Sequence, residues 1–306
     1  MGDQAAKKPL IAQGWLRVLL FGCCFCVIAI LVAVPALLLI AGIKRDDLAA
    51  NPVGTLSAML DGDYLWLMVV LEFVISLLSV WIFRTFIDRK SFGSLGFETR
   101  GFRGEAAAGF FMGPALLGIS CLGLFFSGHL QWTDIHFDPQ SLTVSFGLLL
   151  LIAFSEELVF RGYILNNLLS SFQNKWIALI ISAVLFAAFH ITNPGIHFLA
   201  IANLLIAGLL FGMNYIYTRN LWFSILFHLS WNFFQGPLLG SDVSGLHMPS
   251  LLQLQTTGDL LITGGDFGLE GSIMNMAVSL AAVLILAWAF ERKYSPSRST
   301  TGMLKA

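Results

Sequence analysis

The feature that most limits the fold of this chain is a series of eight apolar segments, each long enough or nearly long enough to cross a bilayer. A helix needs about 20 apolar residues to span roughly 30 Å of hydrocarbon. Backbone groups in that region must satisfy their hydrogen bonds internally. We therefore predict an all-α, polytopic transmembrane helix bundle of about eight spans. The segments cover approximately residues 15–43, 64–87, 106–126, 142–165, 176–190, 198–217, 221–234 and 273–290.

The composition agrees with a membrane protein and excludes several other classes. The chain is 57% hydrophobic and 11% charged, whereas soluble domains have about 25% charged residues. The few basic residues flank apolar segments and form no stripe, so no nucleic-acid partner is expected. All four cysteines lie inside apolar segments without zinc-finger spacing. We interpret the cysteines as small hydrophobic residues. The chain as a whole is expected to be surrounded by the lipid bilayer.

The distribution of basic residues predicts the orientation of the bundle. If the N-terminus is inside, 15 of the 17 Lys and Arg residues lie in inside segments, and only Lys44 and Arg45 lie outside. Inside loops of membrane proteins carry an excess of Lys and Arg. Both termini are therefore predicted to be cytoplasmic, in a multi-pass protein of a prokaryotic inner membrane.

The chain is expected to divide into two parts. Residues 1–105 would hold the first two spans and a cytoplasmic loop from Lys90 to Glu105. This loop either lies in the membrane interface or is an ordinary connecting loop. Residues 106–306 would hold the third to eighth spans. A Gly- and Asp-containing loop from Gln235 to Glu270 is expected on the outside.

Two adjacent acids at the end of an apolar run are the most unusual polar feature. Glu157 and Arg161 are four residues apart, so in a helix they share one face and can pair. Glu156 is turned away by about 100°. A charge at bilayer depth costs roughly 2.5–3.5 kcal/mol or more, which favours a functional role. A structural ion pair that joins two helices is the alternative.

Further polar residues recur at helical spacing in later segments. His190 follows Phe186 by four residues, and Asn232 follows His228 by four, so each pair shares a helix face. A single intramembrane histidine more often forms a hydrogen bond between helices. Two histidines, an asparagine and the acid pair on three segments instead predict one polar site.

These motifs resemble those of a known family. Glu-Glu-x-x-x-Arg, Phe-x-x-x-His and His-x-x-x-Asn occur here in the order found in the CPBP family of intramembrane proteases. That family includes the type II CAAX prenyl protease and relatives involved in bacteriocin immunity and abortive infection (Abi). The resemblance covers about residues 142–235.

The resemblance implies a glutamate-dependent peptidase acting on a membrane-associated protein or peptide, in a cavity open to the cytoplasmic leaflet. Glu156 would be the general base that activates a water, and His190 would hold or polarise that water. His228 and Asn232 would stabilise the oxyanion. Glu157 and Arg161 would keep the site in shape.

A zinc ion is the alternative to metal-free catalysis. Glu156, His190 and His228 could ligate zinc, and the family has been described as metalloproteases for this reason. However, the chain has no His-Glu-x-x-His motif, and asparagine is a poor zinc ligand. We favour a mechanism without a cofactor.

Functions of other classes use the same residues differently. A proton-coupled transporter could use Glu156, Glu157 and Arg161 as a relay, but the inverted repeats typical of transporters are not evident. A non-catalytic immunity protein that acts by binding is the second alternative, and it should tolerate loss of Glu156.

Other polar and small residues in the spans have simpler interpretations. Glu72 in the second span either pairs with a neighbouring helix or lines the cavity. The Gly109-x-x-x-Gly113 and Gly208-x-x-x-Gly212 motifs are interpreted as faces of close helix packing.

Overall fold

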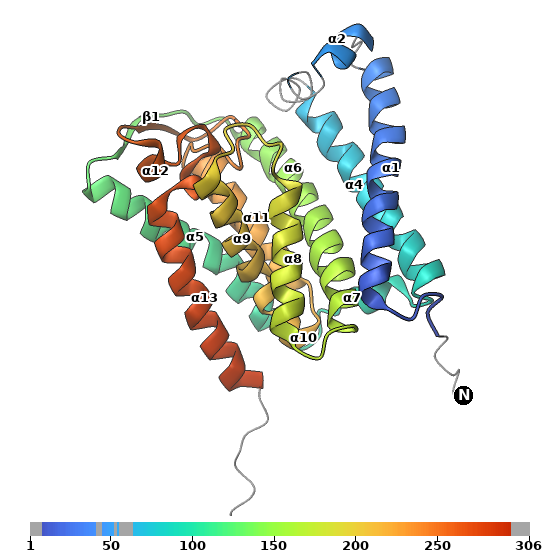
Figure 1. Ribbon diagram of the computed structural model, residues 1–306. Helices are drawn as coiled ribbons and strands as arrows, with labels where there is room; N and C mark the ends of the chain where they lie inside the picture. Colours follow the sequence, from blue (N-terminus) through green and yellow to red (C-terminus); the bar gives the residue numbers. More distant parts are fainter. Residues whose placement is uncertain (1–7, 41–44, 52–53, 55–63, 295–306) are drawn as a thin grey trace, which may run out of the picture.

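The computed structural model describes residues 8–40, 45–51, 54 and 64–294, and helices dominate it (Figure 1). The α-helices are α1 (Gly14–Ile40), α2 (Arg45–Ala50), α4 (Leu65–Ile82), α5 (Arg103–Phe126), α6 (Pro139–Glu157), α7 (Asn166–Leu169), α8 (Lys175–Phe189), α9 (Phe198–Met213), α10 (Tyr215–Thr218), α11 (Trp222–Phe233), α12 (Leu260–Thr263) and α13 (Ile273–Tyr294). Wider π-helical turns follow three of them: η1 (Phe83–Ile87) after α4, η3 (Leu158–Leu165) after α6 and η4 (Phe234–Leu238) after α11. Short 3₁₀ turns are η2 (Phe92–Leu95), η5 (Gly265–Phe267) and η6 (Leu269–Gly271).

The bundle is mainly helical, in agreement with the all-α prediction, and two short strands are its one addition among the described residues. β1 (Leu130–Ile135) pairs antiparallel with β2 (Leu252–Thr256), with an irregularity between Trp132 and Asp134. The strands lie in two outer connections that are more than 100 residues apart in the sequence. Such a pairing leaves no local signal, because a strand of five or six residues is stabilised by its distant partner.

Among the residues that the structure describes, six helical segments are long and apolar enough to cross a membrane, so the chain is an integral membrane protein. Where the structure describes them, all eight predicted segments contain helix, and residues 41–43 of the first lie outside the described residues; however, α8 has 15 residues and α11 has 12. At 1.5 Å per residue these helices are only about 22 Å and 18 Å long. Eight full spans are therefore not confirmed. α11 can be short because it is enclosed by protein: it packs against α5, α6 and α9.

The described ends of the chain lie on one side of the bundle. α1 begins and α13 ends on the side that we call the terminal face, whereas β1 and α12 lie on the opposite side, the strand face (Figure 1). This arrangement agrees with an even number of crossings. That the terminal face is cytoplasmic stays a prediction.

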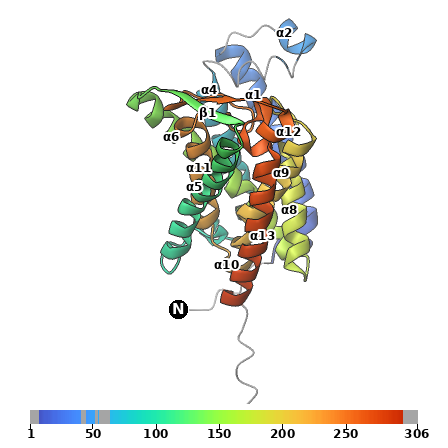
Figure 2. The same ribbon diagram turned by 90° about the vertical axis from the view of Figure 1, so that its left-hand side faces the viewer.

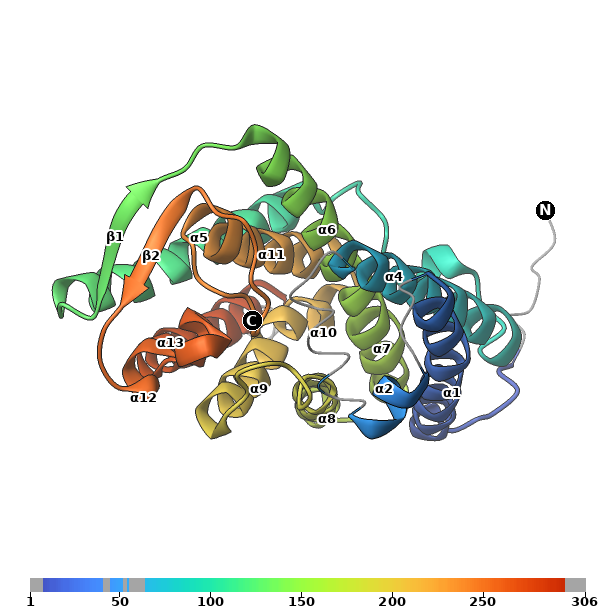
Figure 3. The ribbon, with the colours of Figure 1, turned by 90° about the horizontal axis from the view of Figure 1, so that it is seen from above.

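The helices form a main group and a lateral pair. In the view turned by 90°, α5, α11, α9, α13 and α8 run between the two faces in the main group (Figure 2). Seen from above, α1 and α4 lie together at one edge, and β1 and β2 lie at the opposite edge (Figure 3). α4 packs against α6, and the beginning of α1 packs against α7.

The first turn of α1 is fastened to the bundle by polar contacts. Asp88 is fully buried and accepts hydrogen bonds from Arg17 Nη1 at 3.0 Å and Arg84 Nη1 at 2.9 Å. A Cβ on Gly14 would meet the carbonyl oxygen of Asn167 at 2.1 Å, so this close approach requires glycine. α1 is therefore fixed at the terminal face.

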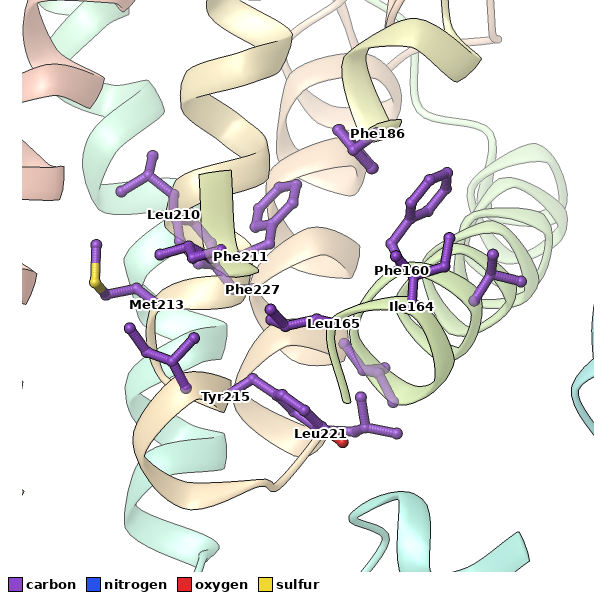
Figure 4. Close-up of a cluster of buried hydrophobic side chains, with 14 of the residues drawn as sticks. Phe160, Ile164, Leu165, Phe186, Leu210, Phe211, Met213, Tyr215, Leu221 and Phe227 are labelled. Carbon is purple, nitrogen blue, oxygen red and sulfur yellow. The ribbon is translucent and has the colours of Figure 1, made fainter. Parts of the chain in front are cut away.

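An aromatic core lies between α8, α9, α11 and η3. Phe160, Phe186, Phe211 and Phe227 are buried there, and Figure 4 shows them with Tyr215 and the neighbouring aliphatic side chains. The rings of Phe186 and Phe160 are 5.2 Å apart at 82°, an edge-to-face contact of the kind that aromatic pairs prefer. This core supports the buried charges described below.

The Gly109-x-x-x-Gly113 motif marks the closest approach between α5 and α11. A Cβ on Gly109 would lie 2.3 Å from the carbonyl oxygen of Phe223, and one on Gly113 would lie 2.4 Å from Ser230 Oγ. The close-packing interpretation is thus confirmed. In Gly208-x-x-x-Gly212 the glycines similarly meet Ala183 and Leu179 of α8.

Gly109→Ala is expected to destabilise the bundle by about 1–3 kcal/mol, because the added methyl group must push two backbones apart. Gly118→Ala on the same helix is the control, since nothing lies within 4 Å of a Cβ at that position. Thermal unfolding in detergent measures both. Equal melting temperatures for the two variants would contradict the close packing.

Candidate active site

Glu156 and His190 meet where α6 approaches the end of α8. Glu156 is the second-last residue of α6, and His190 directly follows α8. Glu156 Oε2 lies 3.6 Å from His190 Nε2, and the two residues are only 7% and 6% exposed. Residues 34 positions apart in sequence are thus brought to a single point.

The backbone of α8 determines which nitrogen of the His190 ring carries the hydrogen. His190 Nδ1 lies 2.9 Å from the carbonyl oxygen of Phe186, which can only accept a hydrogen bond. Nδ1 must therefore carry the hydrogen, and in the neutral ring Nε2 has a free lone pair. The 3.6 Å separation from Glu156 is too long for a direct hydrogen bond. Both atoms are thus directed at the place where a third group can bind.

Glu157 has different contacts from its neighbour Glu156. It is fully buried and accepts hydrogen bonds from Arg161 Nη1 at 2.7 Å and His228 Nδ1 at 3.0 Å. Arg161 Nη2 donates to the carbonyl oxygen of Gly208 at 3.1 Å. The pairing of Glu157 with Arg161 is confirmed. These contacts join α6 and η3 to α9 and α11, so the structural alternative applies to Glu157 and leaves Glu156 free.

Two aromatic rings enclose the buried guanidinium group. The Arg161 Cζ atom lies 4.6 Å from the ring centre of Phe186 and 5.4 Å from that of Phe211. The His228 ring stacks on Phe211 with centres 4.7 Å apart at 14°. The aromatic core therefore holds the ion pair and the imidazole in register, and cation–π contacts of this kind strengthen when water is excluded.

His228 and Asn232 lie on α11 and are 5% and 6% exposed. Their four-residue spacing puts both on one side of that helix. Within residues 64–294, no hydrogen bond joins the Asn232 side chain to Glu156, Glu157 or His190. The structure therefore gathers the acid pair, Arg161 and both histidines, with Asn232 one turn further along.

The arrangement does not provide three ligands for a zinc ion. Catalytic zinc sites use three protein ligands. Glu156 and His190 could supply two, and His228, whose Nδ1 is engaged by Glu157, would have to supply its Nε2 as the third. In the part of the chain that the structure describes, no group of three or more His, Cys, Asp or Glu residues is placed to hold a metal ion. The proposed donor set thus does not fit zinc, and we derive no step through a metal.

Two adjoining cavities form a cleft that reaches the site. α1 and α4 line it on one side, and α6 with η3 and α8 line it on the other; their empty volumes are about 1080 Å³ and 1210 Å³. The first extends from Glu156 and His190 towards Leu246, and the second extends to Val18 near the start of α1. The residues common to both cavities are Phe25, Cys26, Glu72, Glu156 and Phe189.

Two further acidic residues, Glu72 and Glu270, lie near the site. The sequence left two interpretations for Glu72 and gave no indication of Glu270. Glu72 lines both cavities, so the second of its two interpretations is confirmed. Glu270 was assigned only to the end of an outer loop. It accepts hydrogen bonds from Ser244 Oγ at 2.5 Å and Trp231 Nε1 at 3.3 Å, and it interacts electrostatically with His190. Burial raises the pKa of Glu270 above its usual range. A single acid in a loop has no periodicity that would reveal this position.

Comparison with known proteins identifies the same segment. Residues 138–234 match the family model described as type II CAAX prenyl endopeptidase Rce1-like. The matched range contains every candidate catalytic or supporting residue, so the resemblance seen in the motifs is confirmed. No curated protein and no solved structure was found to match. Because the matched family is a protease family, the match supports a peptidase in general.

Proposed function

We propose that this chain, whose residues 138–234 are related to the type II CAAX prenyl endopeptidases, is an intramembrane endopeptidase that uses a glutamate-activated water. Its substrates would be membrane-associated proteins or peptides. One observation carries this proposal: Glu156 Oε2 and His190 Nε2 lie 3.6 Å apart in an apolar cleft, with no direct hydrogen bond between them. Two acceptors so placed can hold the two hydrogens of one water molecule.

Glu156 would act as general base. As the water oxygen attacks the carbonyl carbon of the peptide, one water proton passes to Glu156. Glu156 then returns this proton to the amide nitrogen as the C–N bond breaks, which yields a carboxylic acid and an amine. His190 would orient the water through Nε2 because its Nδ1–H is held by Phe186. Positioned proton transfer typically contributes about 10²–10⁴-fold to a rate.

Asn232 and His228 would stabilise the oxyanion in unequal ways. The Asn232 amide is always a donor. His228 already donates its Nδ1–H to Glu157, so its Nε2 can donate only when the ring is an imidazolium. Fixed donors directed at a developing oxyanion supply a large part of catalysis in acyl transfer.

Catalysis without a metal makes a direct prediction. Treatment of the purified protein with 1,10-phenanthroline, followed by removal of the chelator, is expected to change kcat/KM by less than about twofold, because no bound ion is needed to lower the barrier. Elemental analysis of the active fraction is the parallel measurement. Loss of activity that zinc restores would instead support the site made of Glu156, His190 and His228.

The proposal is tested by mapping protein termini in host membranes that contain either the wild type or Glu156→Gln at matched levels. New ends that vanish in the variant would identify substrates, and their location would test the proposed prokaryotic inner-membrane setting. Identical profiles, with full rescue of a deletion phenotype by the variant, would reject catalysis. The polar residues would then belong to an immunity protein that acts by binding, or to a proton-coupled transporter.

A further inference from the structure

Carboxyl groups line the cleft without a lysine or arginine beside them among the described residues. Among the described residues around its two cavities, the ionisable side chains are Glu72, Glu156, His190 and the thiols of Cys23 and Cys26. No described Lys or Arg side chain contributes to either lining. The cleft therefore presents two carboxyl groups to a substrate and no compensating cation.

Glu72 occupies the middle of the cleft wall formed by α4. Met68, one turn before it, lines the first cavity, and Ser76, one turn after it, lines the second. Glu72 also lies beside the Ser155 hydroxyl and close enough to Glu156 for the two acids to repel each other. The proposed mechanism gives it no role, and it lies outside the matched residues 138–234.

The three arginines that are buried in the described part of the bundle are each held by other groups. Arg161 is held by Glu157 and the carbonyl oxygen of Gly208. Arg17 and Arg84 are held by Asp88. Glu156 Oε2 is buried, with no hydrogen-bond partner within residues 8–40, 45–51, 54 and 64–294. The cleft thus combines an unpartnered buried carboxylate oxygen with a second acid.

A cation from the substrate would relieve this unfavourable arrangement. Burying a charge in apolar surroundings is costly unless it is paired, and two like charges raise the cost. Lys and Arg side chains have a long apolar stem and a charged end. Their stems would pack on the aliphatic and aromatic lining, and their charges would meet Glu72.

We propose that the cleft selects substrates with a lysine or arginine side chain next to the scissile bond, and that Glu72 is the residue that recognises this cation. This inference rests on the proposed endopeptidase function. The carboxyl groups of the cleft would also repel the C-terminal carboxylate of a substrate. Bonds inside the substrate chain would therefore be cleaved in preference to bonds next to its C-terminus.

The test uses the full-length protein in nanodiscs and a set of peptides. A cleaved sequence is first selected from a mixed peptide library by mass spectrometry. It is then made with Lys, Arg, norleucine, Gln or Glu at each position that flanks the cleaved bond. Wild type, Glu72→Gln and Glu156→Gln are compared. Ser79→Ala serves as the control, because Ser79 is buried on the same helix and lines neither cavity.

Wild type is expected to prefer the basic peptides over the norleucine peptides by about tenfold or more in kcat/KM, as a charged hydrogen bond allows. Glu72→Gln should reduce that ratio to under about threefold by slowing only the basic peptides, and Ser79→Ala should keep the preference. An unchanged ratio in Glu72→Gln overturns the proposal. An equal loss for all peptides also overturns it and assigns Glu72 to proton sharing with Glu156. Failure of the endopeptidase function itself would appear differently, as no cleavage by wild type or as cleavage that survives Glu156→Gln.

Discussion

Glu156→Gln is expected to lower kcat by about 10²–10⁴-fold while the fold survives, because glutamine keeps the size of the side chain and removes the general base. Within the described ranges of the chain, the ion-pair partner of Glu156 is the histidine that faces it at 3.6 Å. The amide therefore leaves no opposite charge unpaired in the bundle. Single-turnover cleavage of a peptide, followed by mass spectrometry, measures the rate.

The matched control for this variant is Ser155→Ala, one position earlier. Ser155 is buried, and its hydroxyl donates to the carbonyl oxygen of Ile152 within α6. We expect its kcat within about threefold of wild type, since no reacting group is removed. Melting temperatures of both variants should stay close to that of wild type. A Glu156→Gln protein that retains its rate would exclude the glutamate-activated water.

Arg161→Met is expected to act on stability, with a cost of about 3–5 kcal/mol, because it leaves a buried carboxylate without its cation. Glu157 and Arg161 are both fully buried and 2.7 Å apart. The change also removes the donor that serves the carbonyl oxygen of Gly208. Thermal unfolding in detergent, monitored by circular dichroism, measures the loss.

A double variant separates an unpaired charge from lost packing. Glu157→Gln combined with Arg161→Met removes both charges, and replacing a buried ion pair by uncharged groups is often nearly neutral. The double variant should therefore be more stable than Arg161→Met alone. If Arg161→Met melts like wild type, the buried pair does not stabilise the bundle. The two adjacent acids would thus have different roles. Loss of Glu156 lowers kcat, whereas loss of Arg161, the partner of Glu157, lowers the stability of the fold.

The sequence by itself determined the positions of the helices and the pairs within a helix. The segment predicted at 142–165 is α6 with η3, and that at 176–190 is α8 with His190 at its end. Such boundaries follow from apolar runs and local backbone hydrogen bonds, which depend on neighbours in sequence. The i,i+4 spacing also predicted the pair of Glu157 with Arg161, since helix geometry alone places them together.

Only the tertiary structure decided which groups on different helices meet. That Glu156 faces His190, that Glu157 holds His228, and that Glu72 lines the cleft all depend on how each helix is rotated and how deep it sits. Hydropathy leaves these variables open, because lipid accepts any apolar face equally well. The pairing of β1 with β2 has the same cause. Contacts between distant segments are set by packing of the whole bundle, and no local pattern records them.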